Sequence, residues 1–111
     1  MIFITGPLFA GKKEYIQNAL HLSDAAFAAE AVWDVQERVT PDNIPELTEE
    51  LSQSPIVIAT EIGGGVVPAD PAERAHREAA GRLSCLLAER ADTVVRVCCG
   101  LPQLLKGEWP C

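Results

Sequence analysis

The chain has 111 residues, of which 48% are hydrophobic, and a formal net charge of −7 at neutral pH. This length fits one domain with a packed core and not two, and the acidic balance argues against nucleic acid or an anionic membrane as the main partner, while leaving room for a local phosphate site. No apolar run reaches the length of a membrane span and no signal peptide is recognisable, so we expect a cytoplasmic protein.

The N-terminal segment predicts a strand, a glycine-rich loop and a helix in that order. Ile2 to Thr5 is a short apolar run of the kind that forms buried parallel strands. Lys12 to about Leu20 is predicted to be a helix because its apolar residues recur at helical spacing. This succession is the structural context of a phosphate-binding loop.

The loop from Gly6 to Lys12 has the spacing G-x-x-x-x-G-K. In such loops, backbone N–H groups and a helix N-terminus cradle a phosphate and the lysine reaches the terminal phosphates, so Lys12 is also a candidate catalytic residue. The next position normally carries a hydroxyl for magnesium, so Lys13 is expected to weaken metal binding. The predicted binding residues are Gly6, Phe9, Ala10, Gly11, Lys12 and Lys13. The alternative is an ordinary strand–turn–helix joint with surface lysines.

The segment that follows admits two interpretations. The alanines of "SDAAFAAEAV" favour a helix, whereas Ala31 to Val35 fits the strand that a doubly wound sheet requires between helices. We prefer the strand, which would place Asp34 near its end. Next, Asn43 can cap a helix with Pro45 in its first turn and Glu46 reaching back to the cap.

The run Ile56 to Ala59 predicts a central parallel strand, and Glu61 follows it directly. A carboxylate at this point could hold magnesium through water or accept a proton from a hydroxyl substrate, which makes Glu61 the second candidate catalytic residue. It could equally cap or pair with nearby backbone groups. Gly63 to Gly65 permit close approach to a ligand, or form a flexible turn.

A long helix is predicted from Asp70, its cap, to about Arg90. Arg74 and Arg77 share a face of this helix and could form a fork for phosphate, although solvated salt bridges are the more usual role of such a pattern.

"TVVRVCC" predicts a last strand, in which Cys98 and Cys99 would point to opposite faces, and Gly100-Leu101-Pro102 predicts a turn. The four cysteines contain no C-x-x-C pair, so we expect reduced thiols and no metal site.

The alternation of elements predicts an α/β fold of the P-loop type, with a short, mainly parallel sheet of about four strands flanked by helices. Residues 1–111 would form a single domain with a C-terminal tail from about residue 107. Ligands bind such sheets beyond the carboxyl ends of the strands. Three loops are expected there, at Gly6 to Lys12, Glu61 to Pro68 and Gly100 to Lys106.

The C-terminal half resembles one family closely. Its motifs are Thr60-Glu61-Ile62-Gly63 through Pro68, Ala80-Gly81-Arg82, Ala91-Asp92 and the closing Gly100 to Lys106. They are similar to those of the bifunctional adenosylcobinamide kinase / adenosylcobinamide-phosphate guanylyltransferase of cobalamin biosynthesis. The resemblance covers residues 56–107.

The resemblance implies a P-loop fold, GTP or ATP and adenosylcobinamide as ligands, and often a homo-oligomer. Family members carry a guanylylated histidine in a longer segment between the first helix and the "NEVG" strand. That segment is much shorter here, and neither His21 nor His76 stands at the family position. We therefore expect the guanylyltransferase half to be lost. Asp34 is the candidate for a second carboxylate, and a catalytically reduced nucleotide- or corrinoid-binding or assembly subunit is the alternative function.

Overall fold

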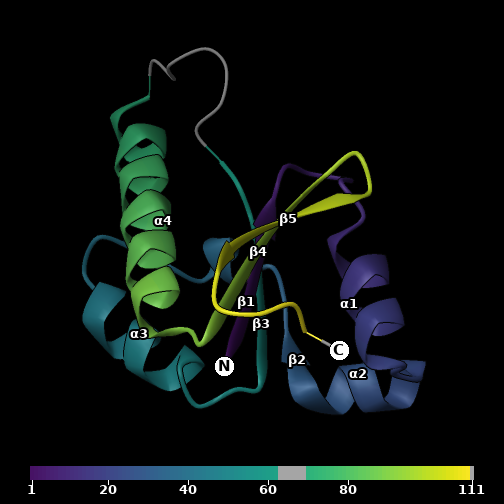
Figure 1. The fold of residues 1–111 in the computed structure, drawn as a ribbon. Coiled ribbons are helices and arrows are strands. Elements are labelled where there is room, and N and C mark those ends of the chain that lie inside the picture. The colour runs from purple at the N-terminus through teal and green to yellow at the C-terminus, as the bar shows by residue number, and fades with distance from the viewer. Residues whose placement is uncertain (63–69, 111) are drawn as a thin grey trace.

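The computed structural model describes residues 1–62 and 70–110, which form one five-stranded sheet between two layers of helices (Figure 1). The strands are β1 (Ile2–Gly6), β2 (Ala31–Val32), β3 (Ile56–Thr60), β4 (Thr93–Cys98) and β5 (Leu101–Lys106). The helices are α1 (Lys12–Leu20), α2 (Asp24–Glu30), α3 (Ile44–Leu51), α4 (Pro71–Arg90) and the short 3-10 helix η1 (Val35–Glu37).

The sheet has the order β2-β3-β1-β4-β5. Strands β2, β3, β1 and β4 pair in parallel, and only β5 is antiparallel to its neighbour. The predicted α/β fold with a mainly parallel sheet is therefore confirmed. Because β1, β3 and β4 run parallel, the loops that follow them lie at the same edge of the sheet.

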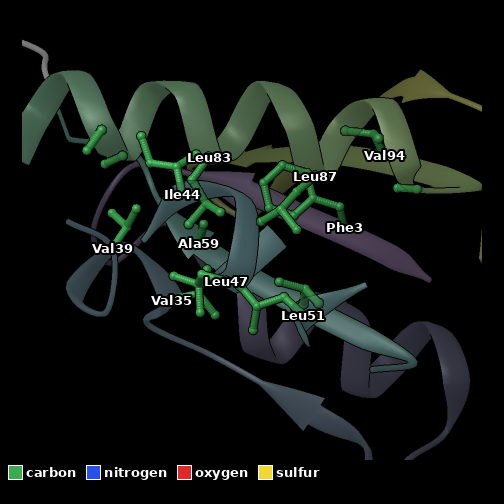
Figure 2. Close-up of a cluster of buried hydrophobic side chains, with 14 residues drawn as sticks. Phe3, Val35, Val39, Ile44, Leu47, Leu51, Ala59, Leu83, Leu87 and Val94 are labelled. Carbon is green, nitrogen blue, oxygen red and sulfur yellow. The ribbon is translucent and has the colours of Figure 1, made fainter. Parts of the chain in front are cut away.

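Two apolar clusters hold the helices to the sheet, one on each face. Phe3, Ala59 and Val94 on the sheet pack against Leu83 and Leu87 of α4, with α3 completing this layer (Figure 2). On the opposite face, side chains of β1, β3 and β4 pack against α1 and α2. All residues of β3 are buried, which explains its continuous apolar sequence.

The segment after α1, for which the sequence allowed a helix or a strand, contains both of these elements. The alanine-rich part forms α2, and a strand follows it, but this strand ends at Val32 and Val35 begins η1. Asp34 between them has a left-handed backbone with φ of 55°. The preference for a strand from Ala31 to Val35 was thus right for two residues and wrong for its end, because the chain turns sharply at Asp34.

The C-terminal hairpin differs from the prediction. The expected loop from Gly100 to Lys106 is in fact the edge strand β5, and the tight turn lies at Cys99 and Gly100, with φ of 54° and 74°. Two consecutive residues with positive φ form the turn that suits a two-residue hairpin. Cys99 therefore lies in the turn, not in the strand, and Pro102 is tolerated because β5 is at the sheet edge.

The caps of α3 and α4 differ, because only α4 has the predicted side-chain hydrogen bond at its N-terminus. Asp70 caps α4 as predicted, since its side chain accepts a hydrogen bond from the Ala72 N–H at 3.0 Å. Asn43 precedes α3 but makes no cap bond. Its side chain instead bonds to Thr40 and Arg38, so it closes the preceding loop. None of the helices described here combines the length and apolar character needed to cross a membrane.

Candidate functional site

Gly6 ends β1 and begins the glycine loop. A Cβ at this position would lie 2.1 Å from the carbonyl oxygen of Val97 on β4, so only glycine fits between the strands. The Gly6 carbonyl accepts a hydrogen bond from the Glu61 N–H at 2.8 Å. The loop after β1 is therefore joined to the end of β3.

The loop after β4 is joined to the same site. The N–H of Gly100 donates to the Ala10 carbonyl at 2.8 Å, which places the hairpin turn against the glycine loop. Gly11 begins α1 with a left-handed backbone, φ 88°, and no side chain caps this helix. At the loop tip, Leu8 and Phe9 are exposed. The structure thus brings two of the three predicted loops together with Glu61, whereas Gly63 to Pro68 lies outside the described residues.

Lys12 is buried, with 8% of its surface exposed, and its Nζ donates to the Pro7 carbonyl at 2.7 Å. Burial lowers the pKa of Lys12, while the carboxylates of Asp34, Glu61 and Glu14 offset part of this effect. Asp34 precedes η1, Glu61 follows β3, and Glu14 lies in the first turn of α1. Lys12 is therefore the positive centre on which the elements of the site converge.

Lys13 does not add its charge to the loop in the way that its position beside Lys12 predicts. Its Nζ lies 5.2 Å from the centre of the Phe27 ring on α2, a cation–π contact. The other partner of Phe27 is Trp33, whose ring stacks on it at 5.3 Å between centroids. Trp33 is half exposed, and Phe27 is buried. The side chain of Lys13 thus packs onto α2, and its backbone remains in the first turn of α1.

Glu61 forms a two-point ion pair with Arg96 across β1. The Arg96 Nε and Nη2 donate to the two carboxylate oxygens at 2.8 Å and 2.9 Å. The Arg96 hydrogen bonds lower the pKa of Glu61; partial burial opposes this shift, and the charges of Arg96 and Lys12 and a hydrogen bond with Thr5 reinforce it. Sequence reasoning missed Arg96. Its position opposite Thr5 in the β1–β4 register could have revealed it once the strand pairing was known.

The replacement Arg96→Met is expected to raise the pKa of Glu61 toward the ordinary carboxyl value, because it removes both hydrogen bonds and the adjacent charge. In the native chain, the stabilisation from this lowered pKa is present above the pKa of the unfolded carboxyl and is lost as the pH falls through the folded value. A ¹³C NMR titration of the Glu61 carboxyl carbon measures the shift. Arg38→Met, which removes the exposed pair with Glu50, is the control and should not alter this titration. An unchanged Glu61 pKa in Arg96→Met would contradict the assigned pair.

Gln36 is a buried polar residue that the sequence did not single out. Its Oε1 accepts from the Thr60 N–H at 2.9 Å, so it ties η1 to the end of β3. Its backbone carbonyl is 2.7 Å from Nε2 of His76 on α4. His76 therefore has a structural partner, whereas His21 lies at the C-terminus of α1.

The remaining predicted residue pair, Arg74 and Arg77, lies in the first half of α4. A hollow of about 430 Å³ lies beside the glycine loop, along α1, and its volume is within the size range of small-molecule sites. It is lined by Gly11, Glu14, Tyr15, Asn18, Ala19 and Gly100.

Magnesium does not fit the side chains of this site. A phosphate-bound magnesium ion uses a loop hydroxyl and one or two carboxylates. Position 13 carries an ammonium instead of the hydroxyl, and both oxygens of Glu61 are bonded to Arg96. Asp34 and Glu14, the other carboxylates near Lys12, interact with the charge of this lysine. In the described part of the chain, the hydroxyl is thus replaced and each of these carboxylates lies near a protein cation.

Two comparisons with known proteins bear on this site. A family model described as cobinamide kinase / cobinamide phosphate guanyltransferase matches residues 13–105. The match includes Glu61, Arg96 and the closing hairpin, and it begins one residue after Lys12. No curated protein matches the chain.

Proposed function

This chain belongs to the cobinamide kinase / cobinamide phosphate guanyltransferase family, and from this premise we propose that it serves cobalamin biosynthesis by binding the phosphates of GTP or ATP at Gly6 to Lys12. One observation carries the proposal: the loops after β1 and β4 and the end of β3 are hydrogen-bonded together around the buried Lys12. The uncapped N-terminus of α1 supplies N–H groups to the same point.

The nucleoside would lie in the hollow beside the loop. This hollow begins at Gly11, where a phosphate would be bound, and continues along α1 past Tyr15 to Asn18. An aromatic ring and a side-chain amide are groups that recognise a base and its polar edge. The corrinoid, adenosylcobinamide, would approach from the side of the exposed Leu8 and Phe9.

Calorimetric titration with the non-hydrolysable analogues of GTP and ATP tests this proposal. Binding of either analogue with a dissociation constant below about 1 mM supports it, and the stronger of the two identifies the nucleotide. Absence of heat with both at millimolar concentration contradicts it. The second candidate is a working kinase. Phosphorylation of adenosylcobinamide at about 1 s⁻¹ or faster, the ordinary kinase range, favours that candidate.

Guanylyl transfer through a protein histidine is expected to be absent. His76 interacts with the Gln36 carbonyl from α4, and His21 ends α1, so neither is paired with a group that would activate it as a nucleophile in the part of the chain described here. Incubation with GTP labelled in the α-phosphate should leave no acid-labile label on the protein. A label that disappears in His76→Ala or in His21→Ala would show that transfer survives.

A further inference from the structure

The mismatch between this site and magnesium has a consequence for the ligand. Resting on the proposed nucleotide function, we infer that the glycine loop binds phosphate groups without a divalent metal, because Arg96 and Lys13 replace the metal-binding groups, and that it does not prefer a triphosphate over a diphosphate.

The first support is the geometry of Glu61. Its two oxygens accept hydrogen bonds of 2.8 Å and 2.9 Å from one planar guanidinium, a bidentate and charge-assisted arrangement. A metal ion at this carboxylate would have to share its oxygens with Arg96 and approach this guanidinium, which carries like charge. The side chains of Glu61 and Arg96 are 37% and 38% exposed, so water reaches the pair.

The second support is the placement of Lys13. Its ammonium packs over Phe27, so the residue has a role in joining α1 to α2 and offers no oxygen to a metal. Lys12 is the cation inside the loop, and its charge favours an anion and repels a metal ion.

The lack of a magnesium ion also affects how strongly the third phosphate of a nucleotide should bind. In phosphate-binding loops, the ion bridges the second and third phosphates and neutralises the charge of the third. Without it, a third phosphate would gain Lys12 but would also approach the carboxylates that interact with this lysine, Asp34 and Glu14, while Glu61 is already paired with Arg96. The gain and the repulsion oppose each other, so a nucleoside diphosphate should bind about as well as a triphosphate.

The test compares GDP and a non-hydrolysable GTP analogue by calorimetry, each in excess magnesium chloride and in EDTA, with ADP and the ATP analogue as a parallel set. The four dissociation constants of a set are expected to agree within about threefold. Binding that becomes at least tenfold tighter with magnesium, or a triphosphate preference of that size, would overturn the inference and leave the proposed function intact. Absence of binding under every condition would overturn both.

A double variant tests which residues are responsible. Lys13→Ser with Arg96→Met restores the hydroxyl and frees Glu61, and should make binding of the triphosphate analogue tighten about tenfold on addition of magnesium. Arg38→Met removes the exposed ion pair with Glu50, and its nucleotide affinity should respond to magnesium as that of the native protein does. If the double variant is unfolded by circular dichroism, Lys13→Ser alone is used, with a smaller response in the same direction. A folded variant without any magnesium response contradicts the assignment to Lys13 and Arg96.

Discussion

Replacement of Lys12 by alanine is expected to weaken nucleotide binding by roughly a hundredfold, the loss of about 2.7 kcal/mol. Lys12 is the buried cation at the point where the loops meet, and it would exchange its bond with the Pro7 carbonyl for bonds to phosphate. Titration of the variant with the analogue that binds the native protein measures the change. A dissociation constant within threefold of the native value would show that the loop does not bind the phosphates through Lys12.

Two further variants separate charge from packing. Lys12→Met keeps most of the buried stem and should bind as poorly as the alanine variant. Since burial lowers the pKa of Lys12, its charge costs folding free energy near neutral pH, and this cost disappears as the pH rises through the lowered value. Lys12→Met should therefore melt at a temperature no lower than the native chain. Lys106→Ala removes the same charge from the edge strand and should leave nucleotide affinity unchanged.

The replacement Gly6→Ala is expected to destabilise the fold by about 3 kcal/mol or more. The new methyl group would lie 2.1 Å from the Val97 carbonyl oxygen, and this atom belongs to the backbone of a buried strand that cannot move away freely. Denaturation by urea measures the difference. Since Gly6 also joins β1 to Glu61, the nucleotide site should lose its shape in the same variant.

The matched control for Gly6 is Gly81 in the middle of α4. A Cβ there meets no atom within 4 Å, and alanine favours a helix over glycine, so Gly81→Ala should stabilise the protein by roughly 0.5–1 kcal/mol. Opposite signs for the two variants would confirm that contact with Val97, and not glycine as such, makes position 6 sensitive. Equal stability of Gly6→Ala and the native chain would contradict the close packing of β1 on β4.

The sequence by itself determined the elements that depend on neighbouring residues. The apolar runs near Ile2, Val57 and Val95 are long enough to be buried strands. The proline and aspartate that begin α4 satisfy a helix N-terminus locally, so its start at Pro71 could be predicted. The glycine loop was recognisable because its spacing reflects backbone geometry that glycine alone adopts easily.

Only the tertiary structure decided what lies around that loop. The strand β5 was missed because its start depends on the left-handed conformation of Cys99, which residue preferences do not favour, and on pairing with β4. The ion pair of Glu61 and Arg96 joins residues 35 positions apart in the sequence. Such a contact exists only because β1 lies between β3 and β4, and strand order is set by long-range packing that local patterns do not encode. The motif already indicated weakened metal binding through Lys13, whereas the pairing of Glu61 with Arg96 came from the fold.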